Sequence, residues 1–163
     1  MREPGTDLFR TSVAPVFRQR VLLLAPLLTR LGPPVLDVVR ETVRAEALRE
    51  WAAFAEREGD RSMRNLVDLL WNRLCLPLGF EYDIEDEGGA IQIRCTRCPI
   101  HEYARELHAL QWGYELHCAQ DPFIAEGFNP GICFTQTKWL MRGDSCCDHR
   151  YVLPSVSCGS PSR

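Results

Sequence analysis

Thiols and carboxylates crowd into the segment from Cys95 to Asp148, which we expect to hold the functional site. The chain has 163 residues and eight cysteines. A thiolate is a nucleophile and a metal ligand, and a carboxylate can transfer protons, so the combination suits covalent hydrolysis or metal binding. Cysteines that only pack a core would not need carboxylates beside them, because a buried carboxylate is costly without a partner.

The sequence Cys95-Thr96-Arg97-Cys98-Pro99 lies where a predicted strand meets a predicted helix. Proline favours the first position of a helix, so Cys98 is expected at the N-cap. Unpaired backbone N–H groups and the helix dipole would there lower the pKa of Cys98 and favour its thiolate. Two cysteines at this spacing are also typical of half a metal site or of two small buried side chains.

Cys118 and Asp121 are three residues apart, which places them on one face of a helix as a candidate catalytic pair. Because Pro122 follows, Asp121 would equally well cap a new helix.

The sequence GDSCCDH at positions 143–149 combines thiols, carboxylates and an imidazole in one turn and strand. Side chains alternate along a strand, so Cys147 and His149 are expected on one face and Cys146 and Asp148 on the other. Asp144, which follows a glycine, is typical of a turn.

A zinc ion is a second hypothesis for the thiols. Its ligands would be Cys95, Cys98, Cys118 and Cys147. The second CxxC pair that a zinc ribbon would have is missing. Hydrolysis by thiols and carboxylates, the first hypothesis, requires no cofactor.

Hydrophobic residues at helical spacing predict helices over 8–31, 35–58 and about 62–75. Expected inward residues include Phe9, Phe17, Leu24, Val38, Trp51, Leu66 and Leu74. The apolar stretch 21–31 is too short to cross a bilayer and contains Pro26, so we expect a buried helix in a cytoplasmic protein with free thiols.

The second half alternates between strand and helix patterns. Strands at 80–84 and 90–94 form one predicted hairpin, and 132–141 with 147–152 form another, turning at 142–145. Helical spacing covers 99–110 and 113–125, where Pro122 would split the second helix.

These elements predict an α+β fold, with N-terminal helices followed by hairpin, helices and hairpin, and one antiparallel sheet covered by helices. We expect a single domain over 1–153, with a helical part at 8–77, a cysteine-rich sheet part at 78–153 and a disordered tail at 154–163. The net charge of −3 argues against nonspecific binding to nucleic acid.

Four motifs resemble those of the L-2-amino-thiazoline-4-carboxylic acid hydrolase family. They are CP at 98–99, ELHCAQD at 115–121, GFNP at 127–130 and GDSCCD at 143–148, and the resemblance covers about residues 80–152. It implies hydrolytic opening of a five-membered ring at its C=N carbon, which gives a carbamoyl derivative of cysteine.

The resemblance also implies roles for individual residues. The matched positions are Cys98, Cys118, Asp121, Cys147 and Asp148 as candidate catalytic residues and Asp144 as a candidate substrate-binding residue. Beside these, His149 is a further candidate catalytic residue, and Arg94 or Arg97 would hold the substrate carboxylate. The family tends to have an aromatic residue at position 149, where this chain has histidine, so another general base and another substrate are open.

Three alternatives remain open from the sequence. The protein would be a noncatalytic module whose cysteines bind a small ligand or zinc. It would otherwise be a biosynthetic tailoring enzyme on the same fold. In the third alternative the cysteines only pack the core. The expected partner is a small-molecule substrate, with no membrane, and the apolar helical half would allow a homodimer.

Overall fold

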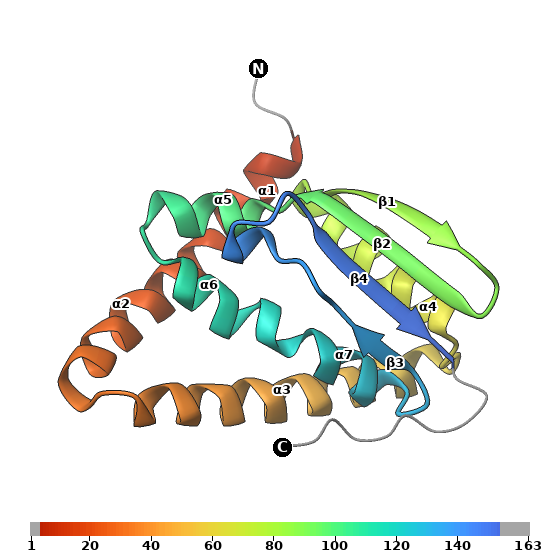
Figure 1. Cartoon of the computed structure of the whole chain (residues 1–163), viewed down its shortest axis with the longest axis horizontal. Coiled ribbons are helices and arrows are strands. Elements are labelled where there is room, and N and C mark those ends of the chain that lie inside the picture. Colours follow the sequence, from red (N-terminus) through yellow and green to blue (C-terminus); the bar gives the residue numbers. More distant parts are fainter. Residues whose placement is uncertain (1–3, 154–163) are drawn as a thin grey trace.

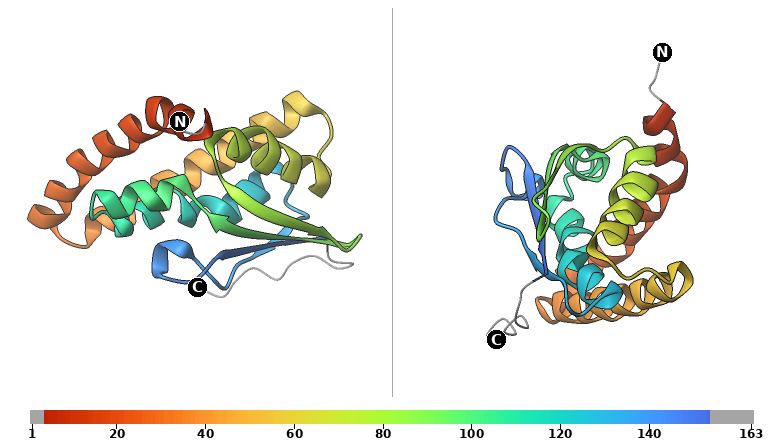
Figure 2. Two further views of the ribbon diagram at one scale, coloured as in Figure 1. Left: turned by 90° about the horizontal axis from the view of Figure 1, so that it is seen from above. Right: turned by 90° about the vertical axis from the view of Figure 1, so that its right-hand side faces the viewer.

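Two pairs of antiparallel strands, far apart in the sequence, join into one four-stranded sheet (Figure 1). The computed structural model of the chain describes residues 4–153. Helices lie on one side of the sheet (Figure 2), so the predicted α+β fold is confirmed. The tail for which disorder was predicted, 154–163, lies outside the described residues.

Prolines and glycines divide the helical half into α1 (Pro4–Ser12), α2 (Ala14–Leu31) and α3 (Pro34–Glu58). The single helix predicted over 8–31 is therefore two helices. Pro15 lies in the first turn of α2, where its missing N–H costs nothing. Gly59 ends α3 in the left-handed region, with φ of 73°.

Part of the apolar surface of α2 and α3 faces solvent. Leu22, Leu23 and Leu31 are each more than 60% exposed, as is Val38, so the prediction of a buried helix over 21–31 and of an inward Val38 was wrong. Phe17 is fully buried in the core, whereas Val21, Leu24 and Leu28 of the same helix are only partly buried against it. None of the helices between residues 4 and 153 has the length and hydrophobicity to span a membrane.

The predicted third helix is irregular. It consists of α4 (Met63–Val67), a π-helical stretch η1 (Asp68–Cys75) and a 3₁₀ turn η2 (Leu76–Leu78). A π-helix has more residues per turn than an α-helix, so the inward positions shift along the chain. Trp71 is consequently buried and Leu74 is 41% exposed, whereas we had expected Leu74 to point inward.

The sheet order is β1 (Glu81–Asp86), β2 (Ala90–Arg97), β4 (Cys147–Val152) and β3 (Cys133–Thr135), all antiparallel. Burial alternates along β4, and the predicted shared inner face of Cys147 and His149 is confirmed. β3 is much shorter than predicted, because the backbone after it bonds to the side chain of Asp148 instead of to a strand.

Four short elements connect the central strand β2 to the edge strand β3. They are α5 (Pro99–Glu106), α6 (Leu110–Leu116), the 3₁₀ turn η3 (Cys118–Gln120) and α7 (Asp121–Phe128). Pro122 lies in the first turn of α7, so the predicted split at this proline is confirmed. The carboxylate of Glu115 on α6 is buried and pairs with Arg40 of α3 through two hydrogen bonds, at 2.6 and 2.8 Å, which anchors α6 just before Cys118.

Gly127 of α7 permits a very close approach to α3. A Cβ atom at this position would lie 2.7 Å from the carbonyl oxygen of Leu48 and 3.0 Å from its Cα. Both atoms belong to the backbone of a long helix, so neither can move aside cheaply.

We therefore expect Gly127→Ala to lower the free energy of unfolding by about 1 to 3 kcal/mol through overpacking. Alanine is otherwise favoured over glycine in a helix by about 1 kcal/mol. A loss of stability on Gly127→Ala would therefore indicate the close contact with α3. Urea unfolding measures it, with Glu126→Ala on the exposed face of α7 as the control. Equal stability of the two variants would show that α7 is not held against α3 in this way.

Candidate functional site

A small cavity lies between the helices and the inner face of the sheet. Its volume is about 120 Å³. Its polar lining consists of Cys75, Cys95, Cys98, Cys118, Cys147, Gln120, Asp121, His117 and His149, and its apolar lining includes Leu70, Trp71, Phe80, Ile100, Ile124 and Met141. The fold thus brings together five of the six predicted catalytic residues.

Each of these side chains is positioned by the end of an element. Cys98 is the N-cap of α5, Cys118 begins the 3₁₀ turn η3, and Asp121 is the first residue of α7. Cys147 and His149 project from the central strand β4 toward the helices. The five predicted catalytic residues therefore reach the cavity from three separate segments.

Asp121 and His149 form the polar centre of the cavity. Asp121 Oδ2 lies 3.3 Å from His149 Nε2, and their side chains are 17% and 8% exposed. At this distance the carboxylate and the imidazole are hydrogen-bond partners. The N-cap of α7 is Gln120, with no capping by a side chain, so the alternative that Asp121 caps the helix was wrong.

Aromatic rings hold the imidazole of His149 in place. The ring meets Trp71 edge to face at a centroid distance of 4.8 Å and lies 5.8 Å from Phe134. The indole N–H of Trp71 donates to the hydroxyl of Tyr151 at 3.2 Å. His149 Nδ1 is buried and has no hydrogen-bond partner among residues 4–153.

The thiols are protonated at neutral pH. Cys98 is the N-cap as predicted and accepts the N–H of His101 at 3.4 Å, but burial outweighs this bond and raises the pKa of Cys98 to about 12. The predicted fall of this pKa was therefore wrong. Burial also raises the pKa of Cys147 to about 11, against the effect of the Leu140 N–H, which donates to its sulfur at 3.3 Å.

Cys118 differs from the other thiols in its charged neighbours. Burial and the negative charge of Asp121 raise its pKa well above 9.0, while the positive charge of Arg142 acts in the opposite direction. Cys118 also lines a second, outer groove of about 370 Å³, so this thiol can be approached from two sides.

Four of the predicted site residues do not line the cavity. The Asp148 carboxylate accepts the N–H groups of residues 137 and 138, at 2.8 and 2.6 Å, and the Thr137 hydroxyl donates to it as well. Asp144 Oδ2 accepts the Trp139 N–H at 2.8 Å. These two carboxylates shape the loop between β3 and β4.

The two arginines predicted to bind the substrate lie elsewhere. Arg94 is exposed on the sheet, and Arg97 pairs with Glu102 at 2.9 Å and with Glu81 at 3.3 Å. Neither lines the cavity, so we assign them no part in the site.

The predicted zinc ligands all line the cavity. Within residues 4–153, however, no three His, Cys, Asp or Glu side chains converge closely enough to hold a metal ion. Four thiols are a donor set that zinc accepts, but as placed here these side chains do not surround one point.

Three lining residues were missed from the sequence. Trp71 and Cys75 are four residues apart on the predicted third helix, which could have shown that they share a face. His117, next to Cys118, stacks on Phe17 at a centroid distance of 5.5 Å, and its Nε2 is buried with no partner in the described chain.

Burial lowers the pKa of His117 from 6.5 to about 4. Since the unfolded chain takes up this proton first, stability is retained above about pH 6.5 and lost as the pH falls toward 4. Between pH 7 and 4.5 the free energy of unfolding should fall in both proteins. We expect the fall to be smaller in His117→Phe than in the wild type, by about 2 kcal/mol. Urea unfolding at both pH values checks this, and identical losses would contradict it.

Residues 14–151 match the family described as L-2-amino-thiazoline-4-carboxylic acid hydrolase, and no curated protein matches the chain. A solved structure with a similar fold is a trafficking protein particle complex subunit 3 from Naegleria fowleri covalently bound to palmitic acid. Its TM-score is 0.56 and its sequence identity 11%, with 92% of this chain and 99% of that chain covered.

At that identity the similarity concerns the fold alone. The family match is of another kind, because it extends from α2 to β4 and includes the helices that carry no motif. The chain therefore belongs to the L-2-amino-thiazoline-4-carboxylic acid hydrolase family.

Proposed function

We propose that this protein hydrolyses a small cyclic amidine by covalent catalysis, with Cys118 as nucleophile and Asp121 as proton acceptor. The observation that carries the proposal is the buried Asp121–His149 pair, which opens onto the cavity that Cys118 lines. A buried carboxylate with a single imidazole partner has unused acceptor capacity, which suits it to accept a proton from a thiol.

Cys118 is favoured over the other thiols by its access and its charge. It is the one thiol that lines both the cavity and the outer groove, so a substrate can reach it from solvent. The positive charge of Arg142 favours its thiolate. Cys147 is more enclosed, with 7% exposure, and stands second.

The high pKa of Cys118 requires that proton transfer accompany the attack. A protonated thiol is a poor nucleophile, and a base beside it supplies the thiolate as the new bond forms. Asp121 is three residues away, on the following helix, and lines the same cavity. His149 positions the carboxylate through the contact at 3.3 Å.

The reaction proceeds in two steps. The Cys118 sulfur bonds to the ring carbon between sulfur and nitrogen, its proton passes through Asp121 to the ring sulfur, and the ring C–S bond breaks. Water then adds across the remaining C=N bond, and Cys118 leaves as a thiol. The sum adds one water and yields an N-carbamoyl derivative of cysteine.

The size of the cavity limits the reacting group. Pockets for drug-sized ligands are commonly about 300 to 1,000 Å³, and this cavity of about 120 Å³ is smaller. A single five-membered ring is of the right order, whereas a long acyl chain is not. The wider part of a larger substrate would have to lie outside, in the groove.

Removal of the nucleophile tests the mechanism directly. With 2-amino-thiazoline-4-carboxylate as substrate, we expect Cys118→Ala to lower kcat by about 10³-fold or more, by analogy with other nucleophile deletions. The matched control is Cys146→Ala, a buried thiol outside the cavity, which should retain activity. Mass spectrometry of the wild type should show the ligand attached to Cys118.

Full turnover by Cys118→Ala would refute the thiol mechanism. Binding of the compound by the wild type without any product would favour the alternative of a noncatalytic ligand-binding module.

Replacement of the base should separate thiol reactivity from turnover. Asp121→Asn removes a negative charge that raises the pKa of Cys118, so more thiolate is present at a given pH and iodoacetamide should alkylate Cys118 faster. The same change removes the proton acceptor and should lower kcat about 10²- to 10⁴-fold. A parallel fall of both rates would mean that Asp121 acts only in folding.

A further inference from the structure

The outer groove is walled by aromatic rings from several elements. Its lining consists of Tyr114, Cys118, Ala119, Pro122, Phe123, Phe134, Thr135, Gln136 and Trp139. The described lining contains no carboxylate, although the chain as a whole is acidic. A negatively charged ligand would therefore meet no like charge on the walls of the groove.

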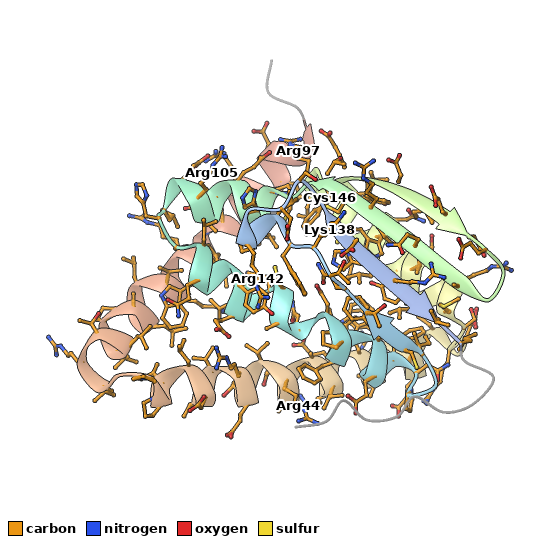
Figure 3. All side chains as sticks on the ribbon, viewed as in Figure 1. Arg44, Arg97, Arg105, Lys138, Arg142 and Cys146 are labelled. Atoms are coloured by element: carbon orange, nitrogen blue, oxygen red, sulfur yellow. The ribbon has the colours of Figure 1, made fainter. Side chains whose placement is uncertain are left out.

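Arg142 stands at the rim of this groove with its guanidinium group held by two of the rings. Its carbon Cζ lies 4.1 Å from the centroid of Tyr114 and 4.6 Å from that of Trp139. Figure 3 shows Arg142 beside α6. Within residues 4–153 it forms no ion pair, whereas Arg40, Arg64 and Arg73 all pair with carboxylates.

Arg142 is exposed, and contact with the two rings restricts its guanidinium group. An arginine held in this way loses little further freedom when it pairs, and its planar fork matches a carboxylate. A cationic ligand would be repelled, and a neutral one would leave the charge unused. The geometry therefore selects a planar anionic group.

We propose that the outer groove is the binding site for the carboxylate end of the substrate, and that Arg142 forms a paired hydrogen bond with that carboxylate. The inference rests on the proposed function and specifies how its substrate is recognised. The substrate then spans Cys118, with its carboxylate outside in the groove and its reacting carbon at the thiol that the groove and the cavity share. Arg142 takes the place that the sequence suggested for Arg94 or Arg97.

Binding, rather than turnover, tests this assignment. The protein is the full chain with Cys118→Ala, which prevents reaction, and the two probes are 2-amino-thiazoline-4-carboxylate and 2-amino-thiazoline, which lacks the carboxylate. We expect Arg142→Gln in this background to raise the Kd of the carboxylate probe about 10-fold or more. The Kd of the probe that lacks the carboxylate should not rise, since it offers no anionic group to Arg142.

Matched variants guard against an indirect effect. Arg105→Gln removes an exposed cation on α5 (Figure 3) and should leave both Kd values unchanged. Arg142→Lys keeps the charge without the planar fork and should recover part of the affinity for the carboxylate probe.

Equal losses for the two probes, no loss for the carboxylate probe, or no binding of either probe would overturn the assignment of Arg142. Failure of the proposed function looks different. In that case Arg142-dependent binding of the carboxylate probe persists although the wild type forms no product. Conversely, turnover by Arg142→Gln with an unchanged KM would leave the proposed function in place and remove this inference.

Discussion

The arrangement of the site depends on one constraint, which is that a carboxylate inside an apolar core must have a partner. Asp121 meets this constraint through His149, whose ring is held between Trp71 and Phe134. The histidine lies among aromatic rings, and its Nε2 meets the carboxylate. The same contact joins the start of α7 to the central strand β4, so the polar centre of the site also connects the helical layer to the sheet.

Placement of that carboxylate depends in turn on the backbone contact between α7 and α3. Gly127 brings α7 against Leu48, and Asn129, just after the helix, donates to the carbonyl of Arg61 at 2.8 Å. The motif residues therefore divide into two groups. Cys98, Cys118, Asp121 and Cys147 line the cavity, whereas Glu115, Gly127, Asn129, Asp144 and Asp148 hold helices and loops in position. The motifs thus identify where the site lies, but they do not distinguish residues that line the cavity from residues that hold the surrounding helices and loops in position.

Local patterns predicted what local physics determines. Alternation along β4 placed Cys147 and His149 on the inner face, and Pro99 placed Cys98 at a helix N-cap, both as observed. The pKa of Cys98 was mispredicted because desolvation depends on residues distant in sequence, which no local pattern contains. The π-helical stretch that turns Trp71 inward, and the loop that occupies Asp148, also result from tertiary contacts. The sequence therefore predicted which residues gather at the candidate site, but not the protonation or the structural role of each one.

Substrate binding and proton transfer are coupled through the charges around Cys118. Arg142 lowers the pKa of this thiol, whereas Asp121 and burial raise it. A substrate carboxylate paired with Arg142 neutralises the one charge that favours the thiolate, and a bound ring excludes water, which adds to the desolvation. Occupation of the site therefore makes the free thiolate less accessible rather than more. In the proposed reaction, attack must then pass the thiol proton to Asp121 in the same step that forms the new bond, which would give a role to a carboxylate beside thiols that are protonated at rest.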